Sequence, residues 1–421
     1  MKILAYTSPA RGHLYPLVPI LDELADRGHR IAVRTLASEV QLMSDRGFDA
    51  APIAPAIEAI EHDDYLAGTP PAKLKRGMAT FGKRSPHEVA DLRAAIDTEQ
   101  PDAILVDCMT WGATAVAESW GGPWAQWFPF PLAMTSRDVP PFGPGLKPAA
   151  GTPGRARDRL LCPVLVGTLK RACFPALNAT REAVGVRPFA TTDEMFSVAP
   201  LLLYMTAEPF EYPRSDWPPS VRMVGPCCWE PPTDPPAWLN ELARPLVLVT
   251  TSSEFQDDGR LVRTALDALA HEDLEVVATM PATELTGDVP ANARVERFIP
   301  HAPLLSHAVC AVTRGGAGAT QKALASGVPV CVVPFGRDQL EVARRVEIAD
   351  AGTRLPAQKL NPERLRKQIR IAMTKQDGAR RVAAGYTATG GAPAATDAFE
   401  ALSSRSNVSP VLESGSPNLR S

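Results

Sequence analysis

The sequence predicts an α/β protein with two Rossmann-like domains, each a doubly wound parallel sheet with helices on both faces. Short apolar runs rich in β-branched residues alternate with longer, helix-like segments in both halves of the chain, which is typical of parallel sheets. A proline-rich segment, residues 213–238, separates the two halves. The length of 421 residues suits two domains.

The individual elements follow from the spacing of the apolar residues. In the first half we expect strands at residues 3–6, 31–35, 104–106, 124–128 and 201–204, with helices at 14–27 and 112–120. In the second half we expect strands at residues 246–251, 275–279, 294–298, 308–312 and 330–333, with helices at 261–269, 317–326, 340–349 and 362–374. Residues 1–212 and 239–385 are therefore predicted as domains, and the prolines of 213–238 favour a semi-rigid linker.

Composition and charge argue against several classes of protein. The formal net charge is −3 and no basic stripe is present, so nothing predicts a nucleic-acid partner. The cysteines are odd in number, at seven, and form no C-x-x-C pair, which favours free thiols in a reducing, cytoplasmic setting. The N-terminal apolar run is too short for a signal peptide, and we expect no stretch of the ~18 apolar residues that span a membrane.

A glycine-rich turn follows the strand expected at 308–312. Its residues, 313–319, read TRGGAGA, and a helix is expected to begin within them. Glycines let the backbone approach a ligand closely, and the free N–H groups of a helix N-terminus attract anions. Arg314 would add a charged donor for a diphosphate. The alternative is a tight turn that needs glycine only for packing, and the Walker ending G-K-[ST] is missing.

His13 and Asp107 each follow a strand of the first half, at the edge of the sheet where ligands gather. An imidazole can take a proton from a hydroxyl at neutral pH. A carboxylate that reaches its Nδ1 would fix the tautomer and stabilise the imidazolium. Taken singly, each residue is better explained as a helix cap. The two at strand ends, together with the glycine-rich turn of the second half, favour a base and its orienting partner.

Residues 315–339, GGAGATQKALASGVPVCVVPFGRDQ, resemble the donor signature of the family-one (UDP-glycosyltransferase-like) enzymes with the GT-B fold. The resemblance covers about residues 1–400 and is strongest to bacterial members that glycosylate macrolides and other natural products. It implies two domains that face a cleft, with a helix at 386–402 that crosses back to the N-terminal domain. The Ser/Pro-rich residues 403–421 are predicted to be disordered.

The resemblance also implies an activity. The expected reaction is inverting transfer of a sugar from a UDP or TDP sugar to a hydroxyl of a small lipophilic acceptor. No metal or other cofactor is expected, because no Asp-x-Asp motif lies near the glycine turn. His13 would remove the acceptor proton while the nucleoside diphosphate departs toward Arg314 and the helix amides.

Roles in donor binding are carried over on the matching positions. The amides of Ala317, Gly318 and Ala319 are expected to hold the diphosphate. Asp338 and Gln339 are expected to hydrogen-bond the hydroxyls of the donor sugar.

Two further segments match the family around the nucleobase and phosphates. In RVERFIPHAPLL, Phe298 would stack on the base, the backbone of Ile299 would read its edge, and His301 lies in the same segment. Ser253 could bond a phosphate oxygen. For Phe298 alone a core aromatic, and for Ser253 alone a loop-capping hydroxyl, would be the simpler interpretation.

Two positions depart from the family. Arg314 replaces a histidine that contacts the diphosphate, and Lys322 replaces a glutamate that holds ribose hydroxyls. Because arginine is longer and always charged, leaving-group geometry is affected, and the change at 322 leaves the choice between UDP and TDP open.

The acceptor pocket is expected from loops at residues 62–90 and 128–175, where prolines and aromatic side chains suit a rigid lipophilic molecule. The alternative is packing beneath long loops. The candidate contacts are Phe128, Phe130, Met134, Phe142 and Phe174.

Three other functions were weighed. A nicotinamide-dependent oxidoreductase is disfavoured because the turn after the first strand lacks G-x-G-x-x-G. A GT-B sugar-nucleotide epimerase shares the fold. A catalytically degenerate relative that only binds a partner fits the changes at Arg314 and Lys322 but gives no reason for His13 and Asp107. No oligomeric state follows from the sequence.

Overall fold

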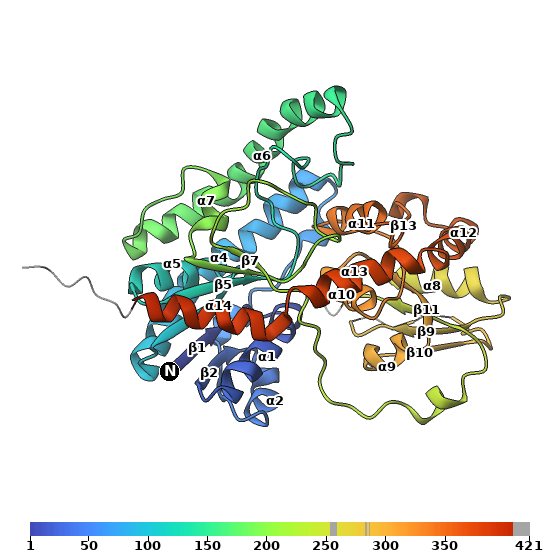
Figure 1. Ribbon diagram of the computed structural model, residues 1–421, viewed down its shortest axis with the longest axis horizontal. Coiled ribbons are helices and arrows are strands. Elements are labelled where there is room, and N and C mark those ends of the chain that lie inside the picture. Colours follow the sequence, from blue (N-terminus) through green and yellow to red (C-terminus); the bar gives the residue numbers. More distant parts are fainter. Residues whose placement is uncertain (253–258, 283, 286, 407–421) are drawn as a thin grey trace, which may run out of the picture.

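The protein consists of two parallel β-sheets, each covered by helices on both faces (Figure 1). The structure is a computed structural model and describes residues 1–252, 259–282, 284, 285 and 287–406. The two sheets lie side by side along the long axis of the molecule. This arrangement confirms the predicted fold class.

The first sheet has seven parallel strands in the order β3-β2-β1-β4-β5-β6-β7. Its strands are β1 (Lys2–Tyr6), β2 (Arg30–Thr35), β3 (Asp49–Pro52), β4 (Ala103–Asp107), β5 (Trp124–Phe128), β6 (Leu201–Tyr204) and β7 (Val221–Met223). Its helices are α1 (Arg11–Asp26), α2 (Val40–Ser44), α3 (Pro55–Glu58), α4 (Pro70–Glu99), α5 (Trp111–Trp120), α6 (Thr152–Val184) and α7 (Thr192–Ser197), with short 3₁₀ turns η1 (Ala37–Glu39) and η2 (Asp64–Leu66).

The second sheet has six parallel strands in the order β10-β9-β8-β11-β12-β13. Its strands are β8 (Leu246–Thr250), β9 (Glu275–Thr279), β10 (Ala293–Glu296), β11 (Ala308–Thr313), β12 (Val330–Val332) and β13 (Gly352–Arg354). Its helices are α8 (Gly259–Leu269), α9 (His301–Leu305), α10 (Ala317–Ala325), α11 (Gln339–Ile348), α12 (Pro362–Met373) and α13 (Gln376–Ala388), with 3₁₀ turns η3 (Ala237–Glu241) and η4 (Ala357–Lys359).

Alternation along the central strands explains the layered core. In β1, Ile3 and Ala5 pack beneath α1, whereas Leu4 and Tyr6 pack on the opposite face with residues of α4 and α5. Successive side chains of a strand point to opposite faces of its sheet. A strand that is apolar at every position is therefore buried on both sides, as parallel strands usually are.

Strand order reverses at the middle of each sheet. β1 lies between β2 and β4 in the first sheet, and β8 lies between β9 and β11 in the second. Connections leave toward opposite faces at such a point, which opens a crevice beyond the carboxyl ends of the strands. His13, Asp107 and the glycine turn all follow strands at these two points.

The C-terminal helices connect the two domains. Val382 and Tyr386 of α13 are buried in the core of the second domain, whereas Ala395 and Phe399 of α14 (Gly391–Ser406) are buried in the first. Figure 1 shows α14 running along the first domain in red. Arg27, the C-cap of α1, forms ion pairs with Asp397 and Glu400 of α14. The crossover expected at 386–402 thus consists of two helices, and residues 403–406 belong to a helix rather than to a disordered tail.

Several local expectations were wrong. Residues 70–99 and 152–184 form the long helices α4 and α6, where loops were expected, and α1 begins at Arg11 rather than at residue 14. The segment 213–238 contributes the edge strand β7 to the first sheet and is not only a linker. Proline misled the prediction, because Pro86, Pro163 and Pro175 lie inside helices, where proline is normally unfavourable.

The expectation of no membrane-length apolar stretch also needs correction. Among the residues that the structure describes, one helix, α6, is long and apolar enough to cross a membrane by length and composition. Its C-terminal half buries Cys173, Phe174 and Leu177 against residues of the first domain. This half of α6 is therefore part of the domain core.

A buried ion-pair network joins the domains beside the crossover. Arg345 of α11 donates to Glu211 of the first domain at 2.8 Å and to Glu341 at 3.0 Å. Tyr204 of β6 also donates to Glu211. Arg345 and Glu211 are 2% and 1% exposed, and removing one partner of such a buried pair typically costs about 3–5 kcal/mol. The network therefore fixes how the two sheets face each other.

Candidate active site

His13 lies in the first turn of α1, directly beyond the carboxyl end of β1. Its carbonyl oxygen accepts a hydrogen bond from the Trp127 indole of β5 at 3.0 Å, which ties the turn to the sheet. The side chain of His13 is 18% exposed. The imidazole is thus held by the fold and still reaches the surface.

Asp107, at the end of β4, is the hydrogen-bond partner of the His13 imidazole. His13 Nδ1 lies 2.8 Å from Asp107 Oδ1 and 3.0 Å from Oδ2. The carboxylate also accepts from the backbone N–H and hydroxyl of Ser8 and from the backbone N–H of Met109. Asp107 is fully buried. The contact predicted from strand positions is therefore present.

The charge of Asp107 decides the tautomer of His13. Burial raises the pKa of Asp107, but the charge and hydrogen bond of His13 and the bonds from Ser8 and Met109 outweigh it and hold this pKa below its ordinary value. An ionised carboxylate can only accept. His13 Nδ1 must then carry the hydrogen, and in the neutral ring the lone pair lies on Nε2.

The same site contains three potential metal ligands. Ligand atoms of His13, Asp107 and Cys108 lie within 4.8 Å of one another. Burial and the charge of Asp107 raise the pKa of the Cys108 thiol well above its ordinary value, and a thiol must ionise to bind a metal. Within this group the structure shows a hydrogen-bonded pair, His13 and Asp107.

The predicted acceptor contacts fall into two groups. Phe128, Met134 and Phe174 are 4–7% exposed and belong to hydrophobic clusters of the first domain. Phe142 is partly exposed. Phe130 packs against the cores of both domains, and its ring centroid lies 5.5 Å from that of His13. Phe130 is thus the predicted acceptor contact that lies at the imidazole.

The glycine turn after β11 is built as expected for an anion site. Gly315 has φ of 92°, and a Cβ there would lie 2.9 Å from Val332 Cγ1, so only glycine fits. Gly316 is the N-cap of α10 and offers no side-chain oxygen to the helix. The first turn of α10 begins at Ala317, and the amides of a first turn lack partners within the helix.

Charged groups from both domains act on Asp338, at the N-cap of α11. Burial raises the pKa of Asp338, and the charges of Arg314, Arg337 and His13 oppose this rise. Arg314 is itself 5% exposed. The geometric link between the two sides is Phe130, whose ring lies 5.5 Å from that of His13 and which also packs against the core of the second domain.

Gln339 is oriented by its own loop. Its Oε1 accepts from the backbone N–H groups of Phe335 at 2.7 Å and Gly336 at 3.1 Å, and the residue is 2% exposed. These bonds leave the amide nitrogen as the group that can donate to a sugar hydroxyl. The role predicted for Gln339 is thus that of a hydrogen-bond donor to the sugar.

Lys322, one of the two departures from the family, is paired with a residue that the sequence did not indicate. Its Nζ lies 2.6 Å from Glu230 Oε1, and Glu230 also accepts from the backbone N–H groups of His301 and Ala302. Burial and the charge of Lys322 lower the pKa of His301 to about 4. His301 is therefore neutral, and its Nε2 lies 3.1 Å from Thr279 Oγ1.

The remaining donor candidates differ in exposure. Phe298 is 52% exposed, whereas Ile299 is 4% exposed and lies in the core of the second domain. An exposed ring beside a buried aliphatic residue is free to stack on a base. Ser253 lies outside the described residues.

Sequence reasoning missed Ser8 and Glu230. Ser8 lies in the same turn as His13 and could have been found from the position of Asp107 across the switch point. Nothing near Glu230 indicates that this residue from the proline-rich segment reaches α9 and α10.

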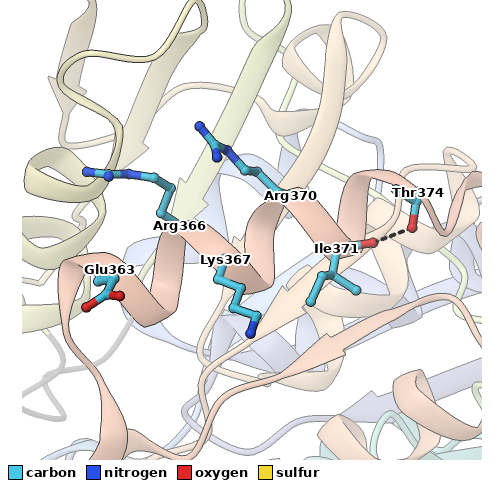
Figure 2. A pocket seen from close by; sticks show the side chains of 6 residues that line it. All are labelled: Glu363, Arg366, Lys367, Arg370, Ile371 and Thr374. Carbon is cyan, nitrogen blue, oxygen red and sulfur yellow. Dashed lines mark hydrogen bonds between the residues drawn. The ribbon is translucent and has the colours of Figure 1, made fainter.

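A surface depression of about 420 Å³ lies elsewhere, along α12. Figure 2 shows its lining side chains projecting from this one helix and the residue that ends it. The lining residues are Glu363, Arg366, Lys367, Arg370, Ile371 and Thr374. Its lining contains none of the candidate site residues that the structure describes, so this depression is not the candidate active site.

Comparison with known proteins gives the family. Residues 263–396 match the family of the erythromycin biosynthesis protein CIII-like C-terminal domain. The chain is 34% identical over 386 residues to 4'-demethylrebeccamycin synthase of Lentzea aerocolonigenes, covering 88% of this chain and 91% of that protein. It is 26% identical over 429 residues to demethyllactenocin mycarosyltransferase of Streptomyces fradiae, covering 95% and 86%. The chain belongs to the natural-product glycosyltransferases with the GT-B fold.

A solved structure of a glycosyltransferase shares the whole architecture. The glycosyltransferase VinC in complex with dTDP superposes with a TM-score of 0.68 at 25% identity, over 96% of this chain and all of that one. These findings confirm the resemblance of residues 315–339 to the glycosyltransferase family, and they confirm that the protein belongs to the glycosyltransferase class of enzymes. A nicotinamide-dependent oxidoreductase is excluded by the same findings.

Proposed function

We propose that this glycosyltransferase transfers a sugar from a nucleoside diphosphate sugar to a hydroxyl of a small lipophilic natural product, with inversion and without a metal. The observation that carries the proposal is the His13–Asp107 pair, whose imidazole lies beside Phe130, a residue that also packs against the core of the second domain. A base on one side and an anion cradle on the other are what a direct displacement needs.

The first half of the displacement is deprotonation of the acceptor as it attacks. Asp107 holds His13 as the Nδ1–H tautomer, so Nε2 takes the proton as the acceptor oxygen attacks the anomeric carbon. The imidazolium that forms is stabilised by the buried carboxylate 2.8 Å away. General base catalysis of this kind contributes roughly 10²–10⁴-fold.

Departure of the nucleoside diphosphate is the second half of the same step. The amides of Ala317, Gly318 and Ala319, with the positive end of the α10 dipole, receive the charge that develops on the leaving oxygen. Arg314 adds a fixed positive charge beside them. This charge replaces the one that a metal ion would supply, which supports a metal-independent reaction.

The surroundings of Asp107 support inversion. Its two oxygens are engaged by His13, Ser8 and Met109, and the residue is fully buried. This carboxylate cannot reach a sugar carbon to form a covalent intermediate. A single displacement reverses the configuration at the anomeric carbon.

The donor nucleotide is either UDP or TDP. The dTDP complex of VinC supports TDP. Position 322, where the family's glutamate would read ribose hydroxyls, holds a lysine that is paired with Glu230. Phe130 beside His13 supports an aromatic or otherwise apolar acceptor.

The test is product analysis with α-linked UDP-glucose and TDP-glucose and a panel of aromatic polyketides, macrolides and flavonoids, in the presence of EDTA. We expect release of the nucleoside diphosphate that depends on the acceptor, and a β-linked product by the anomeric proton coupling in NMR. An α-linked product, or activity abolished by EDTA, would contradict the proposal. Rearranged sugar nucleotide without acceptor would indicate an epimerase.

A further inference from the structure

Arg337 occupies an unusual position in the loop between β12 and α11. Its φ is 52°, in the left-handed region that non-glycine residues rarely adopt. The next residue is Asp338, the N-cap of α11. An arginine is therefore present at a position whose backbone conformation favours glycine.

The side chain of Arg337 reaches across to the first domain. Its Nε donates to Asp64 Oδ2 at 3.0 Å and its Nη2 donates to Oδ1 at 2.7 Å. Two parallel bonds of this kind fix both distance and orientation. The pair joins residues 273 positions apart in the sequence.

Asp64, the partner of Arg337, is buried and ionised. It lies in η2, which packs on α4, and its side chain is 9% exposed compared with 31% for Arg337. Burial raises the pKa of Asp64, but the hydrogen bonds and charge of Arg337 outweigh it and hold this pKa below its ordinary value. The carboxylate is therefore ionised at neutral pH.

We propose that the Arg337–Asp64 pair is a cross-domain clamp that positions Asp338 against the donor sugar. The inference rests on the proposed function. Asp338 is the residue next to the clamp, and the charges of Arg314, Arg337 and His13 act on it. A shift of the Arg337 backbone moves Asp338 directly, so Arg337 is a positioning residue and Asp338 the residue that contacts the sugar.

Other contacts hold the domains together without the clamp. Glu341 accepts from the backbone N–H groups of Gly143 and Gly145 of the first domain, and Arg345 pairs with the buried Glu211. Loss of the clamp therefore leaves the domains joined. The expected consequence is local to the sugar, whereas the nucleoside diphosphate is held by the glycine turn.

The experiment compares calorimetric affinities for TDP and for TDP-glucose, and for UDP and UDP-glucose, in the full-length protein. We expect Asp64→Asn and Arg337→Gly to weaken sugar-nucleotide binding about 5–20-fold while binding of the plain nucleotide changes less than about 2-fold. Arg337→Gly separates the effect of the ion pair from that of the backbone conformation, since glycine keeps the left-handed backbone and loses the ion pair. Arg337→Lys should bind the sugar nucleotide at an intermediate level, because lysine keeps the charge but not the two parallel bonds.

A matched control lies within the first domain. Arg46 and Asp22 form a similar two-bond pair, with both side chains 27% exposed, and Asp22→Asn should alter neither affinity. Melting temperatures of all variants show whether each is folded. The double variant Asp64→Arg with Arg337→Asp should recover part of the lost affinity.

Three results would overturn the clamp. Wild-type affinity for the sugar nucleotides in both Asp64→Asn and Arg337→Gly would remove it. Equal losses for nucleotide and sugar nucleotide would indicate domain closure instead of positioning of Asp338. A wild-type protein that binds no sugar nucleotide would overturn the proposed function together with the clamp, which distinguishes the two failures.

Discussion

The two halves of the candidate site achieve their chemistry in different ways. In the first domain the functional groups are side chains, His13 and Asp107, and the buried carboxylate accepts bonds from three residues. In the second domain the expected diphosphate ligands are backbone amides at the start of α10, placed by a glycine that tolerates no Cβ.

This difference predicts different sensitivities to substitution. Changes to the first-domain pair should lower turnover and leave donor binding intact, because they remove a proton acceptor. Changes to the second-domain turn should act through backbone position and weaken donor binding first.

The largest of these effects is expected for Asp107→Asn. The amide removes the negative charge that stabilises the imidazolium, and its NH₂ group must face an N–H donor, that of Ser8 at the Oδ2 position or that of Met109 at the Oδ1 position. We expect kcat to fall about 10²–10⁴-fold with donor KM nearly unchanged, measured by nucleotide release. Ser8→Ala, which removes one hydroxyl bond to Asp107, should cost less than about 10-fold. A wild-type kcat in Asp107→Asn would show that the carboxylate does not act on His13.

Gly315→Ala tests the second-domain side. With φ of 92° and a Cβ that would approach Val332 Cγ1 to 2.9 Å, the turn must shift. We expect donor KM to rise about 10-fold, equivalent to about 1.4 kcal/mol, with a smaller change in kcat. Gly327→Ala is the control, because Gly327 has φ of 70° at the other end of α10 with its nearest neighbour at 3.7 Å. Equal effects of the two alanines would mean that the turn is only a packing feature.

The smallest effect is expected for Glu88→Gln, which tests whether burial beside the first-domain pair keeps a carboxyl group protonated. Glu88 is fully buried and accepts from Gly112 N–H at 2.8 Å, and its Oε1 has no hydrogen-bond partner among the described residues. Burial, opposed by the Gly112 bond and Arg84 but reinforced by Asp107, raises the pKa of Glu88 to about 8.

The folded state therefore holds a proton on Glu88 that the unfolded state releases at lower pH. Wild-type stability contributed by this group falls as pH rises from about 4.5 to about 8. Glu88→Gln should raise the melting temperature by a few degrees at pH 8.5 and change it little at pH 4.5. A stabilisation that is the same at both pH values would show that Glu88 does not titrate in this range.

The sequence predicted the parts of this molecule whose signals are local. The apolar runs of β1, β4 and β11, the positions of His13 and Asp107 and the glycine turn follow from spacing and turn chemistry alone. Strand order then explains why these residues meet, since parallel strands end at the same edge of a sheet.

Features that depend on distant packing were not predictable in this way. Pro163 and Pro175 suggested loops, yet α6 is a helix of 33 residues because α4 and α5 cover its C-terminal half. The pairs Lys322–Glu230 and Arg337–Asp64 join residues 92 and 273 positions apart. A single sequence contains no periodicity that reports such contacts.

The measurement that tests the central claim most directly is the comparison of His13→Ala and His13→Gln with wild type. Turnover is followed by nucleotide release, and affinity for UDP-glucose or TDP-glucose is measured by calorimetry. If His13 is the base, both variants lose at least about 10²-fold in kcat and keep donor affinity within about 3-fold. Turnover near the wild-type rate in either variant, or loss of donor binding in parallel with activity, would contradict a base that faces the donor across the two domains.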